Sequence, residues 1–524
     1  MPTSSTTSQH LPHANDHTQS SLSVLRHNSS RATIFDIPLI LDEILRHLTI
    51  YDLRNCQCVS KYWNGLCRPG IWRFVSLHNQ CKNNTERESI LQNAHWIRSL
   101  SVDFWDTRVV DGEPCRSLHE LVIWGQQQQQ QLAQQEQKEG EAPDTLLPTQ
   151  TTTAWDLIGR NSALRSLSLK YTELLLPQLT ASYLNLVLFS TIRVLSIDMG
   201  IRILSPLPII TLLSHCPDSL QELSLINTGG IFWKAPIDVV CPASATTLTA
   251  SWRVLPSLRS LCVECQMVEN LHAAILLPLL QHCCPQLKQL TLDLVPRELC
   301  QSLVDILIAS CPFLIDLEMP EVELHDLEMF RLVQSYVGLQ RVDIAIYANM
   351  ADRVIPTLIQ ASGSTLTRVR IVERDAERGQ SNTVPLYPTM FLEQCPRLVS
   401  LVIRPIAWYL GLENCLRSLV EGSNEKEKNA GQWVCPDLET LALSCLVRMD
   451  STNLGRKMAI VKMTERLCWK LRDLKRLKSI RLDRATTSLQ LPIGNADVDA
   501  SQIQVMMERR EEKIREYLYL HMGL

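Results

Sequence analysis

A pattern of aliphatic and polar positions, Leu-x-x-Leu-x-aliphatic, recurs along most of the chain. Neighbouring copies mostly begin 25 to 29 residues apart, and longer gaps mark insertions. A fixed period predicts stacked units, because a single unit cannot bury its apolar face alone. Five copies follow a Cys-Pro pair, at Cys216, Cys284, Cys311, Cys395 and Cys435. Eight further copies begin without that pair, at Ile97, Leu118, Leu164, Ile192, Leu258, Leu339, Leu366 and Leu477.

Each unit reads as a short strand joined to a helix. The last two aliphatic residues of the pattern are two positions apart, so both point to one face of a strand. Residues 272–283 and 299–311 precede two such strands and carry apolar residues at helical spacing. Proline after cysteine disfavours further helix. We therefore predict an α/β fold with parallel strands on a concave side and helices on a convex side, about 60 Å long at a strand spacing of about 4.8 Å.

On these motifs, residues 97–483 resemble a leucine-rich-repeat solenoid of the cysteine-containing, helix-backed kind. The alternative is that the units belong to another parallel α/β fold.

Residues 34–75 have a different character. Pro38 is suited to a first helical position, and aliphatic residues from Leu41 to Leu48 follow at helical spacing. A second amphipathic run extends from Leu53 to Leu66 and includes Trp63. Forty residues can barely bury so many large apolar groups alone, so this helical cluster is a candidate for docking to a partner.

This segment resembles the F-box. The resemblance lies in Ile37-Pro38, the aliphatic helix from Ile44 to Leu48, Asp52-Leu53, the Val59-Ser60-Lys61-x-Trp63 core, and Trp72. It implies a non-catalytic substrate receptor of a Skp/cullin/F-box ubiquitin ligase, without a cofactor, that binds the Skp adaptor and through it a cullin. The residues that it implies for adaptor binding are Ile37, Pro38, Ile44, Leu45, Leu48, Leu53, Val59, Trp63 and Trp72. Two alternatives are an N-terminal cap of the solenoid, and a repeat scaffold or inhibitor outside the ubiquitin pathway.

A protein substrate is expected to bind the concave face or the long insertions. Strand residues between the aliphatic positions face the concave side, and Glu318, Asp343 and Arg370 carry charge there. Aromatic residues on loops of a rigid scaffold are also candidates: Phe232, Trp233 and Trp252 in residues 226–257, and Trp408, Tyr409 and Trp433 in residues 404–437. A solvated face and ring packing onto the arc are the respective alternatives.

The composition narrows the partners further. A net charge of −4 gives no reason to expect nucleic acid, and no run of apolar residues is long enough for a membrane span. Residues 1–30 lack the apolar segment of a signal peptide, so we expect a cytoplasmic or nuclear protein. The 18 cysteines then read as reduced, buried thiols. The only Cys-x-x-Cys, Cys262/Cys265, has no second pair, and we expect no metal site and no catalytic residue.

The expected organisation has four parts. A disordered tail covers residues 1–33, the F-box-like segment residues 34–75, the solenoid residues 76–490, and a C-terminal helix or cap residues 491–524. A Gln-rich insertion at about 126–150 has the composition of a disordered spacer. Ser501 can cap a charged amphipathic helix that runs to about Leu520 and covers the end of the solenoid.

Overall fold

A computed structural model of the protein describes residues 38–77, 84–103, 115, 117–125, 157–159, 161–170, 191–198, 207–227, 252–265, 272–347, 350–374, 387–406, 419, 433–445, 474, 476–484 and 487–492. The expected N-terminal tail, Gln-rich insertion and C-terminal helix lie outside these residues. The chain divides into two compact units, residues 1–71 and 72–524, and each is described by itself.

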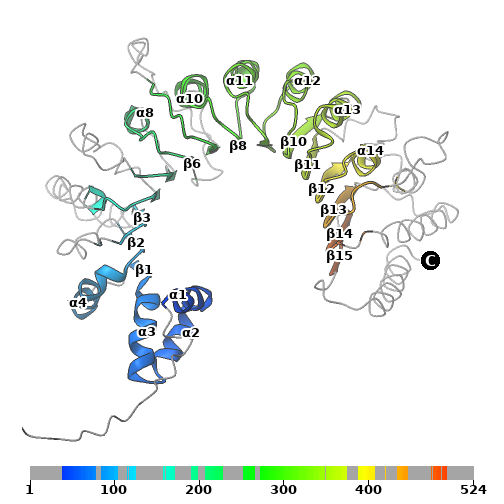
Figure 1. Ribbon diagram of the computed structural model, residues 1–524. Coiled ribbons are helices and arrows are strands. Elements are labelled where there is room, and N and C mark those ends of the chain that lie inside the picture. The colour runs from blue at the N-terminus through cyan, green and yellow to red at the C-terminus, as the bar shows by residue number, and fades with distance from the viewer. Residues whose placement is uncertain are drawn as a thin grey trace, which may run out of the picture. The chain divides into compact units, whose positions relative to one another are not determined.

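The helices alternate with strands through most of the second unit (Figure 1). Their bounds are α1 Pro38–His47, α2 Ile50–Gln57, α3 Lys61–Trp72, α4 Asn84–Asn93, η2 Ala94–Trp96, α8 Leu207–Ser214, η8 His272–Leu276, α10 Leu277–Cys283, α11 Arg297–Ser310, α12 Asp326–Ser335, α13 Ala351–Ser362 and α14 Tyr387–Gln394.

The strands form one 15-stranded sheet in sequence order. They are β1 Phe74–Leu77, β2 Ser99–Asp103, β3 Glu120–Trp124, β4 Ser166–Lys170, β5 Val194–Asp198, β6 Glu222–Asn227, β7 Ser260–Cys265, β8 Gln289–Leu292, β9 Asp316–Met319, β10 Arg341–Tyr347, β11 Arg368–Arg374, β12 Ser400–Ile406, β13 Thr440–Cys445, β14 Ser479–Arg484 and β15 Thr487–Pro492. Neighbours from β1 to β14 pair in parallel, and β15 returns antiparallel to β14. Figure 1 shows the helices on the outer side of this curved row of strands. The second unit is therefore a leucine-rich-repeat solenoid.

The repeat register explains the core. Equivalent aliphatic residues of consecutive strands are paired, as in Leu290 with Leu317 and Val342 with Val369. These side chains are almost fully buried and form one continuous apolar core along the solenoid. The thirteen pattern copies found in the sequence correspond to β2–β14, so the predicted architecture is confirmed.

The first and last strands escaped the sequence pattern. β1 follows directly after α3, and Trp72-x-x-Val75-x-Leu77 is a copy of the repeat with tryptophan in the first leucine position. Trp72 accordingly packs, partly buried, against the solenoid core. β15 lacks a helix before it and pairs in the opposite direction, which periodicity alone does not indicate.

The Cys-Pro cysteines fill a small buried position ahead of their strands, and four of them directly follow or come soon after a described helix, α8, α10, α11 or α14. All five are at most 1% exposed and are free thiols. Their S–H groups reach main-chain carbonyls, as from Cys284 to Leu279 at 3.3 Å and from Cys216 to Leu212 at 3.6 Å. A buried thiol therefore satisfies a helix-end carbonyl while packing as a small apolar group.

The repeat without Cys-Pro before β10 uses another turn. Gly338 has φ of 92°, a conformation that residues with a Cβ atom rarely adopt. The hydroxyl of Ser362, from the next repeat, accepts hydrogen bonds from the N–H groups of Gly338 at 3.1 Å and Leu339 at 3.0 Å. The same hydroxyl donates to the Tyr336 carbonyl at 3.2 Å. One buried serine thus holds the turn in place of a cysteine.

Candidate functional site

The first candidate site is the small helical unit at the N-terminal side. Pro38 opens α1, and Thr49 begins α2 with a capping box in which its hydroxyl accepts from the N–H of Asp52. Ser60 performs the same task for α3, because its hydroxyl accepts from the N–H of Trp63 at 3.2 Å. These two caps fix where α2 and α3 begin.

The interior of this unit is very small. Among its described side chains, Leu53 is 3% exposed and Cys67 is fully buried. α3 approaches α2 closely at Gly70, where a Cβ atom would lie 3.1 Å from a methyl group of Leu53. Larger side chains at that position would push the two helices apart.

Several large apolar side chains of the helical unit face solvent instead. Tyr51 is 72% exposed, Val59 is 71% exposed and Tyr62 is 54% exposed. Ile40 and Ile50 are also exposed. Their density in about thirty residues is unusual for a surface without a partner.

The structure places the predicted adaptor-binding residues in different environments. Ile37 and the side chains of Pro38 lie outside the described residues. Val59 is exposed, Ile44, Leu45, Leu48 and Trp63 are half-buried, and Leu53 is interior. Trp72 belongs to the second unit and serves the solenoid core. Sequence reasoning missed Ile40, Ile50, Tyr51 and Tyr62, because helical periodicity does not say which apolar residues a small cluster leaves uncovered.

The second candidate site is the exposed face of the sheet. The residue between the two buried aliphatic positions of each strand points to this face, and parallel pairing aligns these residues in a row. From β4 to β6 the row is Ser168, Ser196 and Ser224. From β9 to β11 it becomes Glu318, Asp343 and Arg370. The face therefore changes from small and neutral to charged.

The charged part of that row is internally paired. The Arg370 guanidinium donates to the Asp343 carboxylate at 3.1 Å, and the Thr291 hydroxyl donates to Glu318 at 3.2 Å. Burial raises the pKa of Asp343, Arg370 opposes that rise, and the neighbouring Glu318 adds to it. Among the described residues, the second Asp343 oxygen is buried without a hydrogen-bond partner. The predicted trio Glu318, Asp343 and Arg370 is thus brought together on adjacent strands.

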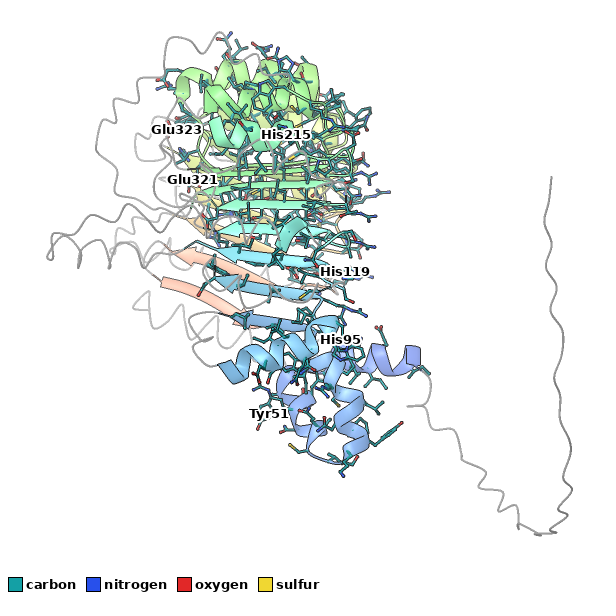
Figure 2. All side chains as sticks on the ribbon, turned by 90° about the vertical axis from the view of Figure 1, so that its left-hand side faces the viewer. Tyr51, His95, His119, His215, Glu321 and Glu323 are labelled. Carbon is teal, nitrogen blue, oxygen red and sulfur yellow. The ribbon has the colours of Figure 1, made fainter. Side chains whose placement is uncertain are left out.

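Acidic residues gather where strands β7 to β9 end. Burial raises the pKa of Asp293, and the carboxylates of Glu321 and Glu264 raise it further. Glu323 lies two residues after Glu321, and its carboxylate is bonded to Arg374 and Tyr347. Figure 2 shows Glu321 and Glu323 at one edge of the strands and His119 at the opposite edge. The two edges of the sheet therefore differ in charge.

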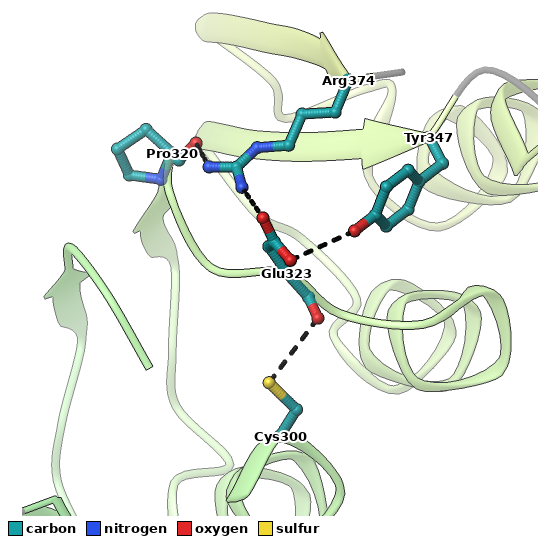
Figure 3. Close-up of polar contacts among 5 residues, drawn as sticks. All are labelled: Cys300, Pro320, Glu323, Tyr347 and Arg374. Carbon is teal, nitrogen blue, oxygen red and sulfur yellow. Dashed lines mark hydrogen bonds and ion pairs between the residues drawn. The ribbon is translucent and has the colours of Figure 1, made fainter. Parts of the chain in front are cut away.

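A polar cluster links three successive repeats at the acidic edge (Figure 3). The Glu323 carboxylate accepts from Arg374 at 2.5 Å and from the Tyr347 hydroxyl at 3.4 Å. Its main-chain carbonyl accepts from the Cys300 thiol at 3.7 Å, and Arg374 also donates to the Pro320 carbonyl at 3.4 Å. These contacts hold the loop after β9 against the ends of β10 and β11.

The predicted aromatic residues of the insertions divide into two groups. Phe232, Trp233, Trp408 and Tyr409 lie outside the described residues. Trp252 and Trp433 are partly buried against the solenoid core. Packing therefore explains these two tryptophans without a bound partner, and their contact with a substrate stays a prediction.

The described part of the chain has neither a cluster of metal ligands nor a membrane-spanning helix. There, no three His, Cys, Asp or Glu side chains are grouped as metal ligands would be. None of the helices in that part combines the length and the apolar character needed to cross a membrane. Burial raises the pKa of the Cys262 thiol to about 12, which keeps it protonated and a poor nucleophile at neutral pH.

Comparisons with known proteins gave one family match and similar solved structures. A family profile described as F-box-like matches residues 39–78. A search of curated proteins found no match. Among solved structures, the leucine-rich repeat-containing protein LegL7 from Legionella pneumophila is similar, with 11% identity and a TM-score of 0.27, over 75% of this chain and 96% of that chain. The assignment of the solenoid rests on its strand order and repeat register.

The fold and its surfaces define a protein-interaction molecule built from two modules. The chain carries an F-box-like domain followed by a leucine-rich-repeat solenoid.

Proposed function

We propose that the protein is the substrate-recognition subunit of a Skp/cullin/F-box ubiquitin ligase. In this proposal the F-box-like unit docks on the Skp adaptor, and the solenoid holds a protein substrate. The protein performs no bond chemistry itself. Its contribution is effective concentration, because a tethered substrate lysine meets the ubiquitin-charged enzyme in an almost intramolecular reaction.

One observation carries the docking half of the proposal. The F-box-like unit exposes Tyr51, Val59 and Tyr62 by more than half of their surface while its own interior holds few side chains. Exposed aromatic and aliphatic groups of this kind are the usual anchors of protein interfaces, where burial in a partner stabilises the complex. The match of this segment to the F-box-like family supplies the identity of the expected partner.

The sheet face supports the receptor half. A rigid parallel sheet offers aligned side chains over many repeats, which suits recognition of an extended protein segment. The predicted substrate contacts Glu318, Asp343 and Arg370 lie on this face.

Co-purification tests the proposal directly. The tagged full-length chain should recover the Skp adaptor and a cullin from cells, and the combined variant Tyr51→Ala, Val59→Ala and Tyr62→Ala should recover neither. Arg54→Ala with Asn55→Ala, both on the exposed side of α2, is the matched control and should behave like the parent. If the parent chain recovers neither protein, the ligase assignment fails and a scaffold outside the ubiquitin pathway takes its place.

A further inference from the structure

One position of the repeat carries positive charge through the first part of the solenoid. It is the residue after the first aliphatic position, just before each strand. We call the following residues the cationic row: Arg73, Arg98, Arg165, Arg193, Arg259 and Lys288, with His119 between Arg98 and Arg165 and Gln221 between Arg193 and Arg259. From β9 to β12 the same position holds Ile315, Gln340, Thr367 and Val399, and before β13 and β14 it holds Glu439 and Lys478.

Main-chain hydrogen bonds align the row. The N–H of Arg98 donates to the Arg73 carbonyl at 3.0 Å, and the N–H of His119 donates to the Arg98 carbonyl at 2.8 Å. The same bond repeats at every step, and it ends in this series with Lys288 donating to Arg259 at 2.8 Å. The row therefore follows the strand spacing of about 4.8 Å and is about 34 Å long.

The exposed arginines and the lysine of the row are not paired with carboxylates of the described residues. Arg98, Arg165, Arg193, Arg259 and Lys288 are exposed, and none forms an ion pair within the part of the chain that the structure describes.

Cations of the later repeats are different. Arg341 pairs with Asp316 at 3.7 Å, and Arg370 pairs with Asp343 at 3.1 Å. Lys478, at the row position before β14, pairs with Glu439 at 3.0 Å. These three cations of later repeats are thus paired with carboxylates, whereas no ion pair joins the row arginines to the described residues.

The surroundings of the row favour an anion along one edge only. The next position in sequence contributes two carboxylates, Glu120 and Glu222, against the six arginine and lysine side chains of the row. In the middle of strands β4 to β6 the exposed sheet face carries small, uncharged side chains, Ser168, Ser196 and Ser224. At the far edge Glu264, Asp293 and Glu321 repel an anion, so an anionic chain is attracted to the beginning of the strands.

We propose that the cationic row binds an extended acidic segment of a protein, with carboxylate or phosphate groups. An extended peptide advances about 3.4 Å per residue, so about ten residues match the row. Nucleic acid is less suited because single strands bind by stacking bases on aromatic side chains, and the row contains no phenylalanine, tyrosine or tryptophan. The inference rests on the proposed receptor function, of which it names the substrate class.

Peptide binding to the full-length protein tests the inference. The probe is a fluorescent peptide of about ten residues in which Glu alternates with Gly, and its anisotropy reports binding. Peptides with Gln or Lys in place of Glu, and single-stranded oligothymidine of similar length, serve as comparisons. The test variant combines Arg165→Gln, Arg193→Gln and Arg259→Gln. The control variant combines Arg297→Gln, Arg331→Gln and Arg353→Gln, which remove the same charge from helices α11, α12 and α13.

We expect the Glu peptide to bind the parent and the control variant with equal affinity. Its affinity for the test variant should be lower by a factor of about ten. Binding should also weaken between about 0.05 M and 0.5 M salt, because exposed charges are screened. Equal binding of the Gln or Lys peptide, unchanged binding by the test variant, or absence of Glu-peptide binding overturns the inference. If oligothymidine binds more tightly than the Glu peptide and the test variant loses this binding, the ligand of the row is a nucleic acid and the proposal is wrong.

Adaptor capture separates this inference from the proposed function. The test variant should still recover the Skp adaptor, because its changes lie outside the F-box-like unit. Intact capture without peptide binding rejects the cationic row alone. Peptide binding without capture by the parent rejects the ligase role and leaves an acidic-peptide receptor.

Discussion

Arg374 at the end of β11 forms an ion pair with Glu323 in the loop after β9, 51 residues earlier in the sequence. The pair passes over β10, whose Tyr347 hydroxyl donates to the same carboxylate. Contacts in a solenoid are mostly between adjacent repeats, so a side-chain bond over two steps stiffens this part of the sheet beyond what stacking provides.

A double-mutant cycle with Glu323→Gln and Arg374→Gln should show this coupling. We expect an interaction energy of about 0.5–1 kcal/mol, because the guanidinium is three-quarters buried and the carboxylate is about half exposed. Hydrogen exchange of residues 341–347 and 368–374 is the measurement. The outer pair Arg331 and Asp305 is the control with a smaller expected coupling, since both partners are more than 40% exposed. If the stability effects of the Glu323 and Arg374 substitutions simply add, the two residues are not coupled and the prediction is wrong.

Tyr336→Phe should destabilise the middle of the solenoid. The Tyr336 side chain is 3% exposed and its hydroxyl donates to the Leu307 carbonyl of the preceding repeat at 2.6 Å. Phenylalanine removes this hydrogen bond and leaves the Leu307 carbonyl with the N–H of Cys311 as its partner at 3.0 Å, so the expected cost is about 0.5–1.5 kcal/mol. Thermal unfolding measures the change, and Tyr51→Phe, at a residue 72% exposed, is the neutral control. Equal midpoints for both variants would show that the bond contributes nothing.

The buried Cys-Pro cysteines should make the protein sensitive to alkali. Burial raises the pKa of Cys216, Cys311 and Cys395 to about 12, and that of Cys435 to about 11, from the model-compound value of 9.0. A folded-state pKa above the unfolded value means that the folded state keeps its protons longer. The stabilisation is therefore complete below pH 9.0 and declines as the pH rises toward about 12. Denaturant midpoints measured from about pH 8 to 11 should fall over this range.

Thiol labelling checks the same point site by site. At about pH 8 iodoacetamide should modify the exposed Cys58 quickly and the five Cys-Pro thiols only after unfolding, because the protonated buried thiol is unreactive. Mass spectrometry of the digested protein locates each label. Rapid labelling of Cys216 or Cys311 in the folded protein would refute their burial.

Trp63→Ala should weaken adaptor capture. Trp63 is half-buried in α3, directly after the exposed Val59-to-Tyr62 stretch, and truncating a central aromatic anchor costs about 2–4 kcal/mol. This corresponds to about thirty- to a thousand-fold in affinity. Titration with purified Skp adaptor measures it, and Arg68→Ala, at an exposed position of the same helix, is the control. Unchanged affinity of a folded Trp63→Ala protein would reject the docking assignment.

The sequence by itself determined the repeat. Side-chain direction alternates along a strand, and proline ends a helix, so the aliphatic pattern predicts thirteen of the strands and the side on which their helices lie. The F-box-like segment was also readable, because its motif is local in sequence.

Only the tertiary structure decided which polar and apolar residues are exposed and which are paired or packed. Trp72 lies within the F-box-like match and also packs, partly buried, against the solenoid core. In the sequence, Arg98, Arg259 and Arg370 cannot be told apart as surface charges. Stacking of the repeats places Arg98 and Arg259 in a row that forms no ion pair with the described residues, and it brings Arg370 against Asp343. Pairing between residues far apart in the chain depends on strand register, and local periodicity contains no information about which charges then meet.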